Sequence, residues 1–274
     1  MEKGNISVVV ATLNSAKTLD WTLLSLLKQR DCSVHTNVID GGSTDETINI
    51  CKKWNVRANY LPPGNMYQAI NEGFVNCHST WYAYLNSDDW IYPASFARLI
   101  SLGEATGADI VYGDCDYNDS SGRFLYSFAA ANPSQLTSLF RMGVLGFAQP
   151  AAIFRKKIYE QLNGFNEYYR LSADYDFYFR AALAGAHIER LRGPSVACFR
   201  LHKHQLSRTQ ATAMQLERRD ICGKLAGRMK LVDLLRFGLW RMANLPHYIL
   251  RFLRVSIISN RIKITKSIDE YEDC

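Results

Sequence analysis

The sequence lacks several features that would assign it to a large class of proteins. It contains no apolar run as long as a membrane-spanning helix requires, and no apolar signal region follows its N-terminal methionine. Its seven cysteines are odd in number and include no C-x-x-C pair, which argues against a disulfide framework or a zinc site. We therefore expect a cytoplasmic protein whose thiols are reduced.

The common glycine-rich phosphate-binding motifs are also absent. Neither G-x-G-x-x-G nor G-x-x-x-x-G-K-[ST] occurs, which disfavours a dinucleotide-dependent enzyme or a P-loop NTPase. A phosphorylated ligand would need another source of positive charge, such as a divalent metal ion. The chain has 274 residues, of which 47% are hydrophobic, so it can bury one large core or two modest ones.

Apolar segments and helical patterns alternate through the first 112 residues. Strands are predicted over residues 6–11, 34–40, 58–61, 81–85 and 109–112, and helices over 18–29, 46–54, 67–77 and 93–106. Ser43 and Glu46 have the spacing of a capping box at the start of the second helix. The alternation predicts an α/β fold, with a mostly parallel sheet covered by helices on both faces.

The pattern changes after Gly113. An aromatic hairpin is predicted over residues 114–127, a helix cap at Asn132, a strand over 149–155, and helices over 157–162 and 173–184. No linker rich in Pro, Gly or Ser separates this half from the first. We therefore expect one domain over residues 1–210.

Polar loops follow three of the predicted parallel strands. They lie at residues 12–15, 40–45 and 86–89, and the last contains the adjacent acids Asp88 and Asp89. The carboxyl ends of parallel strands meet at one edge of a sheet, so these loops should form one pocket. Their carboxylates and amides suit a nucleotide with a metal-bound diphosphate. The alternative is that Asp88 and Asp89 only cap the following helix.

Five segments together resemble the family 2 glycosyltransferases with the GT-A fold, of the type found in bacterial surface-polysaccharide synthesis. These are VVVATLN (8–14), IDGGSTD (39–45), QAINEG (68–73), LNSDDW (85–90) and GFNE (164–167). The resemblance covers roughly residues 5–207 and implies a Rossmann-like sheet. In that family the first two loops hold the nucleoside, a D-x-D-like motif binds a divalent metal, and a later Asp is the catalytic base.

The resemblance implies a site for a nucleotide-sugar donor and for Mg²⁺ or Mn²⁺. It assigns Asp88 as a metal ligand and His202 as a second one, whereas His204 does not fit the family's spacing. Asn86 stands where many relatives have Asp, which removes one negative charge. The residues expected to bind or support the donor are Thr12, Asn14, Asp40, Asn71, Asn86 and Asp89. For Asp40, the alternative is an Asx turn before Gly41.

The catalytic base implied by the resemblance is Asp174. Ala173 stands where the family has Glu, so only the Asp of that pair is present. A helix start stabilises an ionised carboxylate, which can accept the proton of the attacking hydroxyl. The rival is Asp176, for which a structural cap or a salt bridge is the expected role. Tyr67 and Gln149 are candidates for the acceptor or sugar side.

The C-terminal region, residues 211–274, is expected to form basic amphipathic helices. Residues 221–266 hold ten Lys or Arg and a single acid, Asp233, interleaved with large apolar side chains. Such helices bind anionic membrane surfaces. The alternative is that they pack on the catalytic domain with their charges in water. Nucleic-acid binding is not expected, because no binding motif accompanies the charge.

The resemblance implies an inverting glycosyltransferase. It would move a sugar from a nucleotide donor, with UDP expected, to a glycan hydroxyl, and a lipid-linked acceptor at the inner face of the cell membrane would suit the basic region. The alternative is a catalytically weak or inactive relative that serves as a membrane-associated component of glycan assembly, suggested by Asn86 and Ala173.

Overall fold

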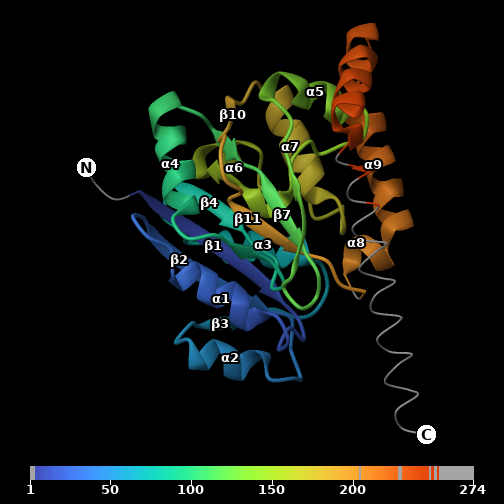
Figure 1. The fold of residues 1–274 in the computed structure, drawn as a ribbon. Helices are drawn as coiled ribbons and strands as arrows, with labels where there is room; N and C mark the ends of the chain where they lie inside the picture. Colours follow the sequence, from blue (N-terminus) through green and yellow to red (C-terminus); the bar gives the residue numbers. More distant parts are fainter. Residues whose placement is uncertain (1–3, 204, 228–229, 247, 250–251, 253–274) are drawn as a thin grey trace, which may run out of the picture.

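The computed structural model describes residues 4–203, 205–227, 230–246, 248–249 and 252 (Figure 1). Strands and helices alternate through its first part, as the periodicity predicts. The elements there are β1 (Asn5–Thr12), α1 (Leu19–Leu27), β2 (Ser33–Asp40), α2 (Thr47–Lys53), β3 (Ala58–Tyr60), α3 (Met66–Phe74), β4 (Trp81–Tyr84), β5 (Trp90–Ile91), α4 (Ser95–Thr106) and β6 (Ile110–Tyr112).

The main sheet has seven strands in the order β10-β6-β9-β4-β1-β2-β3. Here β9 is Ala152–Arg155 and β10 is Ile188–Arg190. Neighbouring strands from β4 to β3 are parallel, as are β6 and β10, and β9 lies antiparallel between β4 and β6. The mostly parallel α/β sheet predicted from the sequence is confirmed. The carboxyl ends of β4, β1 and β2 therefore lie side by side at one edge.

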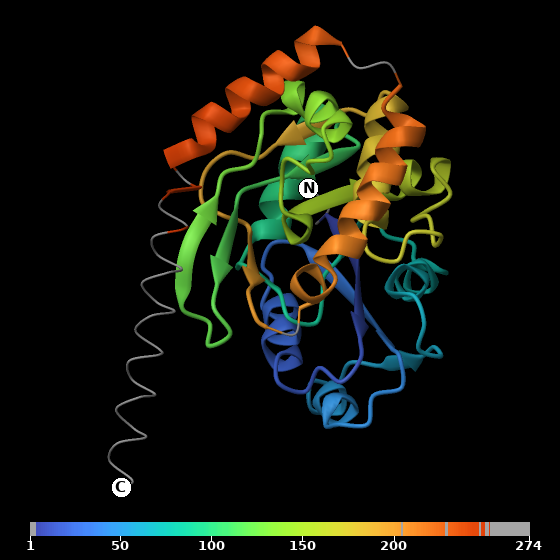
Figure 2. The same ribbon diagram turned by 90° about the vertical axis from the view of Figure 1, so that its right-hand side faces the viewer.

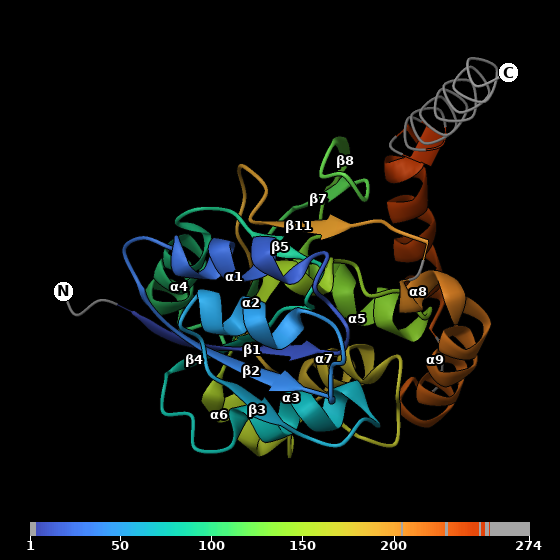
Figure 3. The ribbon, with the colours of Figure 1, turned by 90° about the horizontal axis from the view of Figure 1, so that it is seen from below.

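Helices cover both faces of this sheet. The second half supplies α5 (Pro133–Arg141), α6 (Lys156–Gln161) and α7 (Ala173–Leu183). Apolar side chains of α1 and α4 pack with alternate residues of β1, such as Val8 and Val10, in one buried cluster. Those of α3, α5 and α7 pack with Val9 in the other. Residues that alternate along a strand point to opposite faces, which explains the division. Figure 3 shows α1, α2 and α4 on one side of the sheet and α3 and α6 on the other.

A smaller sheet lies beside the first, with the strand order β5-β11-β7-β8. It contains the predicted hairpin, formed by β7 (Cys115–Asn118) and β8 (Phe124–Phe128), and β11 (Ala197–Arg200). The antiparallel pairing of β11 with β5 places Cys198 opposite Trp90. Since β5 begins directly after Asp89, this pairing brings the paired acids close to the segment that follows Arg200.

Three local predictions are corrected. Ser43 does not form a capping box with Glu46, because its hydroxyl donates to Asp40. The N-cap of α2 is Glu46, and the N–H of Thr47, the first helical residue, donates to the Asp45 carboxylate at 3.0 Å. The strand predicted over 149–155 begins with a 3-10 turn, η1 (Gln149–Ala151), since Pro150 cannot donate to a strand ladder. The helix after the paired acids begins only at Ser95, so neither acid caps it.

The C-terminal helices pack on the α/β part of the chain. After α8 (Leu206–Thr209), α9 (Ala211–Leu225) lies against α7, and its Ile221 is fully buried. Residues 231–246 form a further helix along the outside of the domain, seen at the top of Figure 2. No helix in the described ranges is long and apolar enough to cross a membrane. His204 and residues 253–266 of the basic region lie outside the described residues.

Candidate active site

The three polar loops meet at the carboxyl edge of the sheet, as predicted. Asn14 joins the first loop to the second, because its backbone N–H donates to Ser43 at 2.8 Å and its side-chain oxygen accepts from the N–H of Thr44 at 2.9 Å. The first and third loops meet through the hydroxyls of Ser15 and Ser87, 2.7 Å apart. The sequence alone does not predict this serine pair, because serine is common in loops.

Thr12 and Asp40 lie opposite each other at the ends of the paired strands β1 and β2. The Asp40 carboxylate accepts from the backbone N–H groups of Gly42 and Ser43, both at 2.9 Å, which is the Asx-type turn considered above. Oδ2 accepts both of these N–H groups and Oδ1 accepts the Ser43 hydroxyl, so one lone pair of Oδ1 remains for a ligand donor. The hydroxyl of Thr12 is buried and has no hydrogen-bond partner among the described residues.

Asp88 and His202 are brought together from distant parts of the chain. The Nε2 atom of His202 lies 2.8 Å from Oδ2 of Asp88, and both side chains are partly exposed. The pairing of β5 with β11 creates this contact, as each residue lies just beyond one of these strands. The resemblance predicts both residues as metal ligands, and they lie side by side in the structure.

This pair suits a metal ion that is shared with a ligand. In the described part of the chain, no three His, Cys, Asp or Glu side chains form a group that could hold a metal by themselves. However, Mg²⁺ typically takes one or two protein carboxylates, several waters and the phosphate oxygens of its substrate. A carboxylate and an imidazole at one point therefore fit a cation that arrives with a diphosphate.

Asp89 plays a different part from its neighbour. It is fully buried, and Oδ1 accepts the backbone N–H of Arg200 at 3.0 Å, while Asn86 donates to Oδ2 at 3.3 Å. Burial, and secondly the nearby Asp88 carboxylate, raise the pKa of Asp89 well above its usual range. Asp89 therefore ties the third loop to β11 and does not itself reach a ligand.

Asp174 lies in the first turn of α7, and Tyr67 of α3 reaches it. The Tyr67 hydroxyl donates to Oδ1 of Asp174 at 3.1 Å, and the N–H of Tyr175 donates to the same oxygen at 2.8 Å. Burial raises the pKa of Asp174, while the charge of Arg218 and these hydrogen bonds act in the opposite direction. Because both hydrogen bonds fall on Oδ1, Oδ2 is favoured as the oxygen that accepts a proton.

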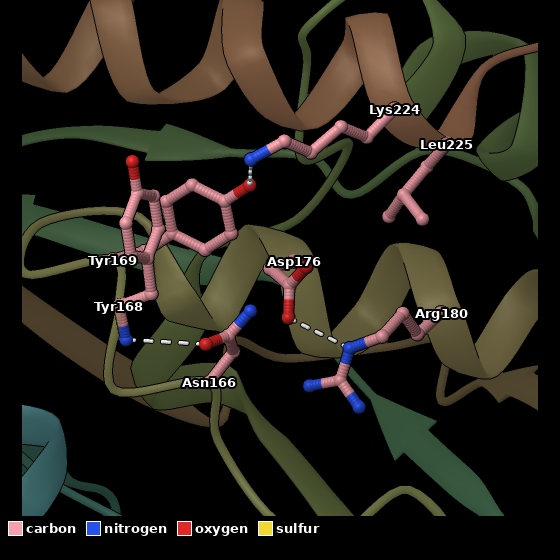
Figure 4. A pocket seen from close by; sticks show the side chains of 7 residues that line it. All are labelled: Asn166, Tyr168, Tyr169, Asp176, Arg180, Lys224 and Leu225. Atoms are coloured by element: carbon pink, nitrogen blue, oxygen red, sulfur yellow. Dashed lines mark hydrogen bonds and ion pairs between the residues drawn. The ribbon is translucent and has the colours of Figure 1, made fainter.

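Asp176 is held by a salt bridge, as expected for the rival acid. Its Oδ2 lies 2.7 Å from Nε of Arg180, whose other nitrogens donate to the carbonyls of Leu162 and Gly164. Asp176 and Arg180 line a cavity of about 250 Å³, together with Tyr169 and Lys224. Figure 4 shows these side chains. Arg180 thus fastens the loop before α7 to the helix, and Asp176 has a structural partner that Asp174 does not share.

Two other predicted residues have roles inside the fold. Gln149 donates to the carbonyl of Tyr84 at 2.9 Å, and its buried Oε1 has no partner among the described residues. Asn71 uses its whole amide, since it donates to Phe165 and Glu167 and accepts from Tyr159 and Phe165. The structure therefore gives Asn71 a structural role, holding the loop over 164–167, rather than a free group for a donor.

Residues 7–162 match the sequence model described as glycosyl transferase family 2. The chain belongs to this family. The family prediction made from the five segments is confirmed, and the chain is a glycosyltransferase.

Similar proteins take part in glycan synthesis. The chain is 28% identical over 208 residues to the PGL/p-HBAD biosynthesis glycosyltransferase of Mycobacterium bovis, covering 70% of this chain and 75% of that protein. It is 30% identical over 191 residues to the succinoglycan biosynthesis protein ExoO of Rhizobium meliloti. That match covers 62% of this chain and 53% of ExoO, so the chain spans about half of that relative.

Solved structures of S. aureus TarS share the fold. The complex of its residues 1–349 with UDP-GlcNAc superposes with a TM-score of 0.58 and 19% identity, over 73% of this chain and 60% of TarS 1–349. The complex with UDP gives a TM-score of 0.61 at 17% identity, over 85% and 68%. In the longer TarS structure the match covers only 39% of that chain. At these identities the likeness confirms the GT-A type of fold.

Proposed function

We propose that this glycosyltransferase is an inverting enzyme that transfers a sugar from a UDP-sugar to a hydroxyl of a glycan acceptor. The observation that carries the proposal is the meeting of Asp88 and His202 at the edge where the three loops converge. Nucleotide ligands bind at this edge of open α/β sheets. The complexes of TarS with UDP and UDP-GlcNAc support a UDP-sugar as the donor.

The donor binds across the first two loops. Thr12 offers its hydroxyl and Asp40 the remaining lone pair of Oδ1 to the nucleoside, while Asn14 keeps the two loops together. Asn86 lies beside Asp89 on the third loop and can reach the ribose. Asp88 and His202 hold Mg²⁺ or Mn²⁺. When bound, the cation neutralises charge on the diphosphate leaving group, which replaces the missing glycine-rich phosphate loop.

Asp174 acts as the general base in a single displacement. The acceptor hydroxyl gives its proton to the Asp174 carboxylate as the oxygen forms a bond to the anomeric carbon, and the bond from that carbon to the diphosphate oxygen breaks. Attack from the face opposite the leaving group inverts the anomeric centre. Tyr67 fixes the carboxylate through its hydrogen bond to Oδ1. We assign Gln149 to the sugar or acceptor side, because its Oε1 has no partner among the described residues.

The acceptor is proposed to be lipid-linked, with the enzyme bound at the inner face of the cell membrane. The support comes from the helix over 231–246 and the residues beyond it. One face packs on the domain through Trp240, which is buried, and through Phe237. The opposite face is apolar and exposed. Its side chains, between 46% and 72% exposed, are Leu231, Leu234, Leu235, Leu239, Met242, Leu245, Ile249 and Phe252.

The charges around this face favour an anionic membrane. Asp233, the single acid of residues 221–266, is buried and paired with Arg141 at 2.9 Å and with Ser138 at 2.8 Å. The exposed charges of this region in the described residues are therefore basic, with Arg236 and Arg241 beside the apolar face. Apolar side chains flanked by basic ones are typical of helices that lie in the membrane interface. Each basic residue adds about 1 kcal/mol of attraction to anionic lipid.

A panel of nucleotide sugars tests the proposed activity without knowledge of the acceptor. Hydrolysis of each donor is measured with Mn²⁺, with Mg²⁺ and with EDTA, because water can replace the acceptor slowly. We expect one UDP-sugar to be turned over only with a metal. The alternative function, an inactive member of a glycan-assembly complex, predicts UDP-sugar binding at most, with no turnover of any donor.

A further inference from the structure

Helix α9 forms hydrogen bonds to the start of α7, the helix that carries Asp174. The Glu217 carboxylate accepts the backbone N–H groups of Arg170, Leu171 and Ser172, each at 2.9 Å. These three N–H groups lie just before and at the N-cap of α7, where donors have no partner within the helix. A carboxylate there also interacts favourably with the helix dipole. Glu217 therefore acts as an N-terminal cap supplied by another helix.

Further contacts fasten the same segment to α9. The hydroxyl of Ser172 donates to the carbonyl of Met214 at 3.3 Å, and the hydroxyl of Tyr169 donates to Asp220 at 2.8 Å. On α7 itself, the Tyr175 hydroxyl lies 3.0 Å from the sulfur of Cys222. The position of the Asp174 backbone therefore depends on α9, which lies beyond the region that resembles the family.

Arg218, the residue after Glu217, also contacts α7. Its guanidinium lies over the ring of Tyr175, 5.6 Å from the ring centre, and its charge favours the ionised form of Asp174. Its Nε is buried and has no hydrogen-bond partner among the described residues. The groups that interact electrostatically with Asp174 are Tyr67 of α3, Tyr84 of β4, Tyr178 of α7 and Arg218. Three of these are phenols, and Arg218 is a cation.

We propose that α9 belongs to the catalytic machinery, with Glu217 holding the start of α7 and Arg218, stacked on Tyr175 next to the base, serving as its counter-charge. Both are positioning residues, since neither is placed on the reacting atoms. The inference rests on the proposed role of Asp174 as the base. A buried carboxylate without a counter-charge takes up a proton more readily and then cannot act as a base.

The direct test is the titration of the Asp174 carboxyl by ¹³C NMR. The full chain is labelled with ¹³C-aspartate, and the Asp174 signal is assigned as the one missing in Asp174→Asn. Arg218→Met keeps the stem that packs on Tyr175 but removes the charge, and we expect it to raise the pKa of Asp174 by about 1 unit. This readout requires no substrate, so it stands apart from the proposed activity.

Two variants control this experiment. Arg219 is the next residue and is exposed, so Arg219→Met makes the same change of charge away from Asp174 and should leave its pKa unchanged. Arg218→Lys keeps the charge and should stay close to the wild type. If Arg218→Met does not fold, Arg218→Gln takes its place. The proposal is overturned if the neutral Arg218 variant titrates like the wild type, or if Arg219→Met shifts Asp174 as much.

Discussion

The hydroxyl of Tyr67 and the carboxylate of Asp174 lie 3.1 Å apart, although 107 residues separate them along the chain. Tyr67 is buried and stands in the first turn of α3, so its hydroxyl is held in place by packing. A fixed donor beside a partly buried carboxylate both orients it and favours its ionised form. The pair thus joins two helices around the proposed base.

Tyr67→Phe should lower turnover about tenfold and leave the fold intact. It removes one hydrogen bond to a charged group, worth about 1.5 kcal/mol, while the ring remains. The loss should grow as the pH falls, because Asp174 without this donor is protonated at higher pH. Tyr178→Phe is the matched control, since the Tyr178 hydroxyl is buried and has no partner in the described residues. Equal rate losses in both variants would contradict the assigned role of Tyr67.

Asp88→Ala should abolish the metal-dependent part of UDP binding. Calorimetry with UDP is performed with Mn²⁺, with Mg²⁺ and with EDTA, on the wild type, Asp88→Ala and His202→Ala. We expect tight binding only for the wild type with metal, and an intermediate result for His202→Ala. The exposed Glu72 of α3 provides the control Glu72→Ala. Equal affinity under all conditions would show that no metal is shared with the diphosphate.

Glu217→Ala should destabilise the protein by about 2 kcal/mol, the upper range for the loss of a helix cap. For a domain of this size, that corresponds to a decrease in Tm of about 4–8 °C. Thermal unfolding followed by circular dichroism measures it. Gln215→Ala removes an exposed side chain from the same helix and should change Tm little. A Tm equal to that of the wild type in Glu217→Ala would mean that the three N–H groups find other partners.

Replacing Leu235, Leu239 and Met242 by Gln should release the protein from vesicles that contain phosphatidylglycerol. All three side chains are more than half exposed, so the fold should persist. The control replaces Leu183, Leu206 and Leu216, exposed leucines outside this helix, in the same way. We expect the control to sediment with vesicles and the first variant to stay in solution. Sedimentation of both would exclude this face as the membrane contact.

Local pattern was sufficient to predict the strands and helices that carry the site. The apolar residues of β1 predicted a strand of the sheet. The acids after β4 were predicted at its carboxyl edge, because the direction of a strand determines the edge at which the following loop lies. The predicted pair of Asp88 and His202 likewise depended on strand ends and on the family's order of motifs.

The roles of single polar groups depend on tertiary contacts that the sequence does not display. Asn71 was expected at the donor, but its amide is used by residues 88–96 positions further along the chain. Ser43 has the spacing of a capping residue, yet the nearer Asp40 carboxylate takes its hydroxyl. The net charge of residues 221–266 indicated only a basic region. Glu217 of α9 lies just before that region, and its carboxylate binds the N–H groups before α7 only because α9 packs on α7.

The most direct test of the account compares donor turnover by Asp174→Asn and Asp176→Asn, with the UDP-sugar and metal found in the panel. Asp174→Asn should lose turnover by about 10²–10⁴-fold and still bind UDP, because an amide of the same shape cannot accept the proton. Asp176→Asn loses only part of a salt bridge with Arg180 and should retain most of the rate at a temperature where it is folded. If Asp176→Asn abolishes turnover while Asp174→Asn remains close to the wild type, the assignment of Asp174 as the base is wrong.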